Sequence, residues 1–344
     1  MAKPFSRRKF GVCSFSLLSA LLAGSATQAL AEPQVPPGTK IDKPKPPSNV
    51  LVPGTGPRVA KGDDDFENED FVYYPQHPKS SHNIDKNIRV PGAITKNLKW
   101  VEAAKRGAPD IVKRVPTPPG GLKDSTGAML IQTLHSGIPG KLSYEDQQDD
   151  LLYNLSQMIG SYIPVGHSPN CTVRVYIPKV SDWEPLYHHS FGYRAGLLGN
   201  KPDGDSDEYW PGFFFEQRYG LRNNERHSFI QSWVRADGWG RDMPGPTFEP
   251  ETWATLGMSF TPDGQCHFFG KRGIEDLTIE DHLGSYFSYS WRAHTFQTYF
   301  FNVMNRDDGR SISTPWTIDD PMLFVATPPK RPVTAERGSG RVRG

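Results

Sequence analysis

Trp253-Ala-Thr-Leu-Gly-Met-Ser-Phe260 runs into Thr261-Pro-Asp-Gly264, and the chain returns as Gln265-Cys-His-Phe-Phe269. The segments on both sides of the turn are rich in aromatic and β-branched residues, which favour strands. Within the turn, proline presets φ and glycine can adopt a positive φ. The three segments together therefore predict a β-hairpin.

Segments of the same kind recur at short intervals along the chain, separated by Gly, Pro and Asp. Residues 143–163 carry both helix and strand signals, and two short strands are slightly favoured; residues 100–106 predict a short helical turn. Beyond the hairpin, the predicted strands are residues 71–74, 111–115, 128–134, 171–177, 190–197, 213–219, 227–235, 296–304 and 316–325. Strands at this spacing predict an antiparallel β-sandwich.

The composition agrees with a turn-rich β protein. The 344 residues include 33 Gly and 32 Pro, and 36% are hydrophobic, which is enough to build a packed core. The 39 basic and 38 acidic residues nearly balance, so the chain has no general basic field. Nucleic acid is therefore not expected as a partner.

The first residues have the pattern of an export signal. Lys3, Arg7, Arg8 and Lys9 precede a mostly apolar stretch, and small residues near position 31 offer a cleavage site. The paired arginines resemble a bacterial twin-arginine signal, with an ordinary secretory signal as the alternative. The predicted organisation is a signal peptide at 1–31, a Pro-rich linker at 32–61, a β-sandwich at 62–327 and a disordered basic tail at 328–344, exported without a membrane span.

Removal of the signal leaves two cysteines, Cys171 and Cys266, both in predicted strands. In an oxidising compartment they could form a disulfide if their strands are neighbours. The alternative is two buried thiols that act as small apolar residues.

The start and the end of the predicted domain resemble a known superfamily. Asp64-Asp-Phe-Glu67 opens the domain, Trp316-Thr-Ile-Asp-Asp-Pro-Met-Leu-Phe-Val325 closes it, and the Trp253 strand leads to an Asp-Gly hairpin. This is similar to the concanavalin A-like lectin/glucanase superfamily, particularly its exported bacterial proteins. The resemblance implies an all-β, antiparallel two-sheet jelly-roll sandwich over about residues 62–327, with its first and last strands adjacent. It does not assign a function, because this sandwich hosts lectins, hydrolases, lyases and adhesion modules.

Two catalytic signatures of that superfamily are absent from the sequence. The clustered Glu-x-Asp-x-x-Glu of laminarinase-like hydrolases does not occur, nor do the Arg-Thr-Glu-x-Arg and Gln-Ile-His strands of its alginate lyases. No catalytic residue is assigned on this basis, and no cofactor is required.

Alternation along the later strands predicts one polar, aromatic face. Successive strand side chains point to opposite faces, so residues two apart share a side. Aromatic rings, amides and guanidinium groups together suit sugars, and arginine also suits a uronate or sulfate. The predicted ligand-binding residues are Glu216, Arg218, Gln231, Trp233, Arg235, His267 and Asn302.

Several functions are compatible with this face. The leading hypothesis is binding of a carbohydrate or cell-envelope polymer without catalysis. The second is a lyase, with His267, His227 or Tyr299 as base and Arg218 or Arg235 to neutralise a carboxylate. An inverting hydrolase would need a second carboxyl besides Glu216. The third hypothesis is a structural module, in which Glu216 and Arg218 form a structural ion pair and Trp233 only covers the sheet.

A structural Ca²⁺ ion is possible where the terminal strands meet. Asp65, Glu67 and Asp319 would supply oxygen ligands if those strands pair. The alternative is a set of solvated acidic turns.

Overall fold

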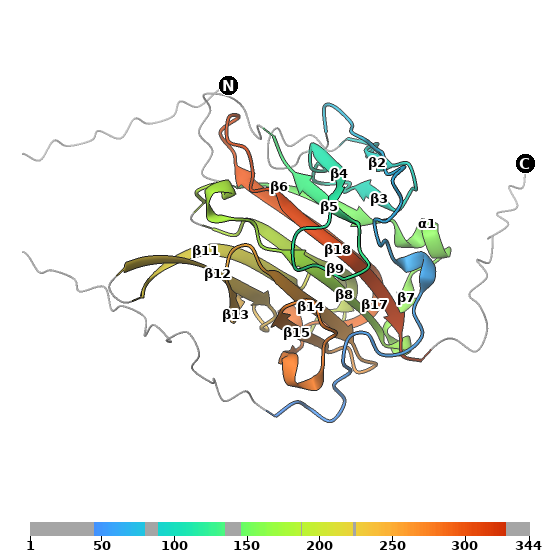
Figure 1. Ribbon diagram of the computed structural model, residues 1–344. Coiled ribbons are helices and arrows are strands. Elements are labelled where there is room, and N and C mark those ends of the chain that lie inside the picture. The colour runs from blue at the N-terminus through green and yellow to red at the C-terminus, as the bar shows by residue number, and fades with distance from the viewer. Residues whose placement is uncertain (1–44, 80–88, 135–145, 187, 223–224, 328–344) are drawn as a thin grey trace, which may run out of the picture. The chain divides into compact units, whose positions relative to one another are not determined.

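The computed structural model describes residues 45–79, 89–134, 146–186, 188–222 and 225–327. Its strands form two antiparallel sheets (Figure 1). The seven-stranded sheet has the order β16-β15-β14-β8-β18-β5-β4. Its strands are β4 (Ile111–Pro116), β5 (Gly127–Gln132), β8 (Pro169–Tyr176), β14 (Trp253–Phe260), β15 (Cys266–Arg272), β16 (His282–Tyr286) and β18 (Trp316–Val325).

The eleven-stranded sheet has the order β1-β2-β3-β6-β17-β9-β11-β12-β13, with β7 paired to β17 and β10 paired to β9. Its strands are β1 (Tyr73–Tyr74), β2 (Ile94–Thr95), β3 (Trp100–Glu102), β6 (Asp146–Tyr153), β7 (Ile163–Pro164), β9 (Phe191–Asn200), β10 (Ser206–Tyr209), β11 (Gly212–Arg222), β12 (Glu225–Arg235), β13 (Asp242–Phe248) and β17 (Arg292–Arg306). The short helices are η1 (Ala60–Gly62), α1 (Leu155–Ile159), η2 (Val165–His167), η3 (Val180–Asp182), η4 (Ile279–Asp281) and η5 (Ser288–Ser290). The all-β two-sheet sandwich expected from the concanavalin A-like superfamily is confirmed.

The core between the sheets is built largely from aromatic side chains. Trp316 of β18 stacks on Phe191 of β9 at 4.7 Å between ring centroids and on Phe215 of β11 at 5.5 Å. Trp100 of β3 contacts Tyr153 and Phe301 at 5.2 and 5.3 Å. Fully burying one such side chain contributes about 1.5–3 kcal/mol, so these contacts hold the two sheets face to face.

The start of the predicted domain lies beside the last strand, although the segment there is not itself a strand and the first strand, β1, lies in the other sheet. Arg58 and Phe324 form a β-bridge, and the Val59 amide donates to the Leu323 carbonyl at 2.7 Å. The Leu323 amide in turn donates to the Asp63 carboxylate at 2.9 Å. The last residues of the predicted linker thus contact β18, while the predicted signal peptide and tail lie outside the described residues.

Two local predictions differ from the structure. Residues 100–106, predicted as a helical turn, instead begin with strand β3, because Trp100 and Glu102 are buried against β6. Residues 143–163 contain the predicted strands β6 and β7, but the helix α1 lies between them. Of the apolar residues at helical spacing, Leu155, Met158 and Ile159 lie in the helix, whereas Leu151 and Leu152 lie in β6.

The two cysteines are buried thiols, not a disulfide. Cys171 lies in β8 and Cys266 in β15, and β14 pairs with both strands. Two strands separated by a third are about 9–10 Å apart, too far for a disulfide. Burial raises the pKa of each thiol to about 12, so neither is reactive at neutral pH.

No helix in the described part of the chain is long and apolar enough to span a membrane.

Candidate functional site

The pairing of β11 with β12 brings three of the predicted residues into contact. Glu216 lies opposite Gln231 and Phe214 opposite Trp233. The Trp233 indole donates to Glu216 Oε2 at 2.7 Å, and Arg218 Nε lies 3.1 Å from Glu216 Oε1. The Arg218 guanidinium lies over the Trp233 ring, 5.1 Å from its centroid. Glu216 therefore holds the indole and the guanidinium together.

Phe214 is the centre of a second group on the same face. Its neighbours Phe213 and Phe215 belong to the core, so Phe214 points away from the core. Its ring contacts three cationic or imidazole groups: Arg235 at 4.4 Å, Arg194 at 5.2 Å and His189 at 4.6 Å from the centroid. Two guanidinium groups and an imidazole are thus gathered on one aromatic ring.

Arg235 is fixed by Asp242 of the neighbouring strand β13. Its Nε and Nη2 donate to the two Asp242 carboxylate oxygens at 2.8 and 2.9 Å, a bidentate pair. The pKa of Arg235 is lowered by burial, but the hydrogen bonds from Arg235 to Asp242 and the nearby Tyr289 outweigh burial and raise it overall. Arg235 is therefore a permanent positive charge with a fixed orientation.

His189 lies beside this ion pair and is neutral at pH 7. Its Nε2 is 3.6 Å from Asp242 Oδ2. Burial is the main reason that the pKa of His189 is lowered to about 4; Asp242 acts in the opposite direction, and Arg235 and Arg194 act in the same direction as burial. Its side chain is still 20% exposed, so a ligand can reach the imidazole.

Arg194 of β9 and Asn302 of β17 lie deeper in the same face. Arg194 Nε and Nη2 donate to the Trp210 carbonyl at 3.1 and 2.6 Å, and Nη1 lies 3.5 Å from Asn302 Oδ1. The Asn302 amide also donates to Asp150. Burial lowers the pKa of Arg194 to about 10 and raises that of Asp150.

A glycine makes this close packing possible. A Cβ on Gly192 would lie 2.9 Å from Asn302 Oδ1 and 3.1 Å from the Phe214 ring, so a larger residue would separate the two. We call the whole group the outer-face cluster; its members are His189, Arg194, Phe214, Glu216, Arg218, Trp233, Arg235, Asp242, Asn302 and Asp150.

His267 does not belong to this face. It lies in β15 of the other sheet and is fully buried, with Nδ1 at 2.6 Å from Ser285 Oγ and Nε2 at 2.8 Å from Thr261 Oγ1. The expectation that His267 shares a face with the other predicted residues was wrong, because alternation gives the face of a strand and not its sheet. Burial lowers the pKa of His267 to about 4, and its contacts are structural.

The other predicted candidates have mostly structural contacts. Gln231 shares the outer face, but its amide nitrogen donates to the carbonyls of Ser232 and Gly245 at 2.7 and 2.8 Å. Tyr299 is fully buried in the core and donates to the Gly62 carbonyl at 2.8 Å, so it cannot act as a base on a ligand. His227 lies 3.1 Å from Glu249, which joins β12 to the end of β13.

Five members of the cluster were not among the predicted residues: His189, Arg194, Phe214, Asp242 and Asp150. A signal for one of them was available. Gly192 and Gly196 lie two residues on either side of Arg194, so the strand presents arginine between two glycines on one face. The glycines leave room for side chains of neighbouring strands to pack beside the arginine; at Gly192 these are Asn302 and Phe214.

The residues proposed for Ca²⁺ do not assemble into a shared set of ligands. Asp65 is exposed, while the Glu67 carboxylate accepts hydrogen bonds from the Thr126 and Gly127 amides. Asp319 accepts from Ser125 at 2.9 Å. The described residues contain no group of three or more His, Cys, Asp or Glu side chains placed to hold a metal ion. A structural Ca²⁺ stays a prediction.

Asp319 predicts an unusual pH dependence of stability. It is 1% exposed, and its Oδ1 has no hydrogen-bond partner within the described part of the chain. Burial raises the pKa of Asp319 to about 7, whereas an unfolded aspartate titrates near 4. Between these values the folded state binds the extra proton, so stability decreases as pH rises from about 4 to 7.

Asp319→Asn should therefore stabilise the protein at pH 8, by roughly 2 kcal/mol, and have little effect at pH 4. Urea denaturation at both pH values measures this difference. Asp205→Asn, on an exposed loop, is the control for removal of one carboxylate. An equal change in stability at pH 4 and pH 8 would contradict the proposed titration.

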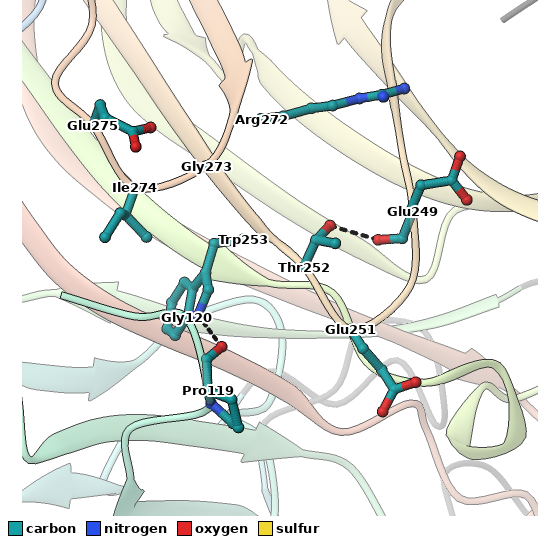
Figure 2. Close-up of a pocket in the computed structure, with 10 residues that line it drawn as sticks. All are labelled: Pro119, Gly120, Glu249, Glu251, Thr252, Trp253, Arg272, Gly273, Ile274 and Glu275. Atoms are coloured by element: carbon teal, nitrogen blue, oxygen red, sulfur yellow. Dashed lines mark hydrogen bonds between the residues drawn. The ribbon is translucent and has the colours of Figure 1, made fainter. Parts of the chain in front are cut away.

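A separate pocket of about 510 Å³ lies near the start of β14 (Figure 2). The Trp253 indole donates to the Pro119 carbonyl at 3.1 Å, which fixes the loop that carries Pro119 and Gly120. The charged residues that line the pocket are Glu249, Glu251, Glu275 and Arg272. Three carboxylates and one guanidinium make this pocket acidic, so it does not suit an acidic polymer.

The chain matches no model of a known protein family and no curated protein sequence. Solved structures with a similar arrangement of strands include a family 7 alginate lyase in complex with substrate, at 12% identity and a TM-score of 0.35 over 62% of this chain and 85% of that one. They also include a carbohydrate esterase from a Shiga toxin-encoding bacteriophage, at 11% identity and a TM-score of 0.36 over 67% and 91%. A third is an endo-β-1,4-glucuronan lyase from the fungus Trichoderma reesei, at 12% identity and a TM-score of 0.33 over 63% and 90%. The similarity concerns the fold alone.

Proposed function

We propose that the outer-face cluster binds an acidic polysaccharide. The observation that carries this proposal is the arrangement of Arg218, Trp233 and Glu216. Arg218 is 45% exposed but lies over the indole, and Glu216 fixes both groups from the side. A guanidinium held in one orientation loses little conformational entropy when it binds a carboxylate.

Arg235 provides a second, equally fixed guanidinium on the same face. Its side chain is 28% exposed, and Asp242 and the Phe214 ring define its position. Two oriented guanidinium groups on neighbouring parts of a sheet suit a chain of uronate or sulfated sugars, since each acidic group can accept paired hydrogen bonds. Neutral polymers would not use these donors in the same way.

The proposal is tested by measuring the binding of alginate, polygalacturonate and hyaluronate, with dextran as the neutral control. Trp233→Ala removes the plane under Arg218 and should weaken binding of the acidic polymer about tenfold, because a cation–π contact contributes about 0.5–2 kcal/mol. Trp233→Phe keeps an aromatic plane and should lose less. If the wild-type protein binds none of the acidic polymers, or binds dextran equally well, the proposal is wrong.

A lyase is the second candidate, supported by His189. Elimination on a uronate needs a base for the C5 proton and positive groups that neutralise the carboxylate. His189 is neutral at pH 7 and lies beside Arg235 and Arg194. A bound uronate would raise the pKa of His189, which strengthens it as a base. A lyase would release unsaturated products that absorb in the ultraviolet; no such product from any acidic polymer would leave only the binding function.

A further inference from the structure

The loop between β12 and β13, residues 236–241, presents a tryptophan to solvent. Trp239 is 84% exposed, whereas Trp233, the tryptophan of the outer-face cluster, is only partly exposed. Isolated exposed apolar residues are common on protein surfaces and by themselves indicate nothing. What distinguishes Trp239 is how firmly its loop is held.

Asp237 organises the loop through its carboxylate and its carbonyl. Its Oδ1 accepts hydrogen bonds from the amides of Trp239 and Arg241 at 2.9 and 2.7 Å, and its Oδ2 pairs with Arg241 Nε at 2.7 Å. Its carbonyl accepts from the Gly240 amide at 3.0 Å. The backbone on both sides of Trp239 is thereby fixed.

A second segment, η5, supports the loop from outside. The Tyr289 amide donates to the Asp237 carbonyl at 2.9 Å, and Ser290 Oγ donates to the Gly238 carbonyl at 2.9 Å. Gly240 has a φ of +72°, and a Cβ there would lie 2.3 Å from the Tyr289 ring. The ring of Tyr289 is therefore packed directly against the loop.

This support comes with backbone strain. Tyr289 and Ser290 both have positive φ, +61° and +62°, a conformation that costs about 1–3 kcal/mol per residue for non-glycine residues. Such strain persists where the surrounding structure holds it in place, and it is frequent at ligand-binding sites. Here two strained residues hold a loop whose most prominent side chain is an exposed indole.

The loop continues directly from the outer-face cluster. It lies between Arg235 and Asp242, and these two residues form the bidentate pair described above. A polymer that contacts Arg235 and extends past the end of β12 therefore meets the loop next. Indole rings suit the apolar CH face of a pyranose ring, and a rigid loop binds without a large loss of entropy.

We infer that Trp239 is a stacking platform for a sugar ring of the polymer bound at the outer-face cluster, one or more residues beyond the sugar held by Arg235. The inference rests on the proposed polysaccharide binding. Trp239 would form an additional binding site at the end of this face. Only a ligand long enough to reach beyond Arg235 could occupy that site. Trp239 is thus expected to select for chain length and not for charge.

The test compares wild type, Trp239→Ala and Trp239→Phe in calorimetric binding to alginate, polygalacturonate and hyaluronate, each as a polymer and as a disaccharide. Trp239→Ala should weaken binding of the polymer about five- to tenfold and leave disaccharide binding unchanged, while Trp239→Phe should retain most of the affinity. Because the side chain is 84% exposed, the midpoint of thermal unfolding should not change. The matched control is Leu221→Ala, which should bind like wild type. Leu221 is also an exposed hydrophobic residue of the same sheet, at 72% exposure.

The outcomes separate the two proposals. If wild type binds a polymer and Trp239→Ala binds it with equal affinity, the platform is wrong and the outer-face cluster stands. If Trp239→Ala loses affinity for the polymer and the disaccharide equally, the inference that Trp239 selects for chain length is also wrong. If wild type binds none of the polymers, the proposed function and the platform both fall.

Discussion

Replacing Trp316 with alanine should lower the free energy of unfolding by about 3–5 kcal/mol, the range for removing a large aromatic side chain from a packed core. Trp316 is fully buried and lies between the two sheets. It stacks on Phe191 at 4.7 Å and Phe215 at 5.5 Å and contacts Trp183 edge-on at 5.0 Å. Its indole also donates to Ser190 at 3.2 Å, so alanine would leave a cavity and an unpaired hydroxyl.

Guanidinium denaturation measures this loss through the midpoint at constant m-value. Trp316→Phe keeps most of the stacking and should cost clearly less than Trp316→Ala. Tyr219→Ala, at a side chain that is 50% exposed, should change stability by less than about 1 kcal/mol. If Trp316→Ala were no more destabilising than Tyr219→Ala, the aromatic stack would not be what holds the sheets together.

The strands that the sequence predicted best are those with strong local signals. The hairpin at Trp253–Phe260 combines β-branched and aromatic residues with a Pro-Asp-Gly turn, and β14 has the predicted bounds. β18 has the predicted bounds as well, because a polar turn precedes it and core residues fill it. In both strands the local sequence preference agrees with the tertiary packing. The local preference was therefore sufficient to predict them.

Local signals failed where tertiary contacts outweigh propensity. Strand β13 contains Pro244 and Pro246, which argue against a strand, yet it forms the edge of its sheet, where proline is tolerated. At β3 the Ala-Lys-rich residues after Glu102 favour a helix, but Trp100 is buried in the core and pairs with Tyr153. Burial of one indole outweighs a helix propensity of a few tenths of a kcal/mol per residue.

The candidate site was predictable within a strand pair but not between distant strands. Alternation placed Glu216, Trp233 and Arg235 on one face, and the neighbouring strands β11 and β12 bring them together. Arg194 reaches the same face because β9 lies between β17 and β11, an order that no local pattern contains. The same lack of information on sheet order put His267 on the wrong sheet.

The proposed acid–base chemistry of a lyase would rely on His189, which lies ahead of β9 in a segment without strand signals. Burial holds the pKa of His189 at about 4, below the unfolded value of about 6.5. The unfolded chain therefore binds a proton that the folded one excludes, and stability decreases as pH falls from 6.5 towards 4. His189→Gln removes this loss, so the variant should resist acid better than wild type in that range.

If the protein is a lyase, His189→Gln should also reduce the rate of product release by a factor of about 10²–10⁴, the usual contribution of a general base. Glutamine has a similar size and keeps the Arg235–Asp242 pair, so binding of the acidic polymer should change little. The measurement is the ultraviolet absorbance of unsaturated products at saturating polymer, together with polymer affinity. His227→Gln, which removes a partly exposed histidine of β12 at its contact with Glu249, is the control. A variant of His189 that loses affinity and rate in equal proportion would show that the imidazole only holds Asp242 and Phe214 in place, since a base acts on the rate and not on ground-state binding.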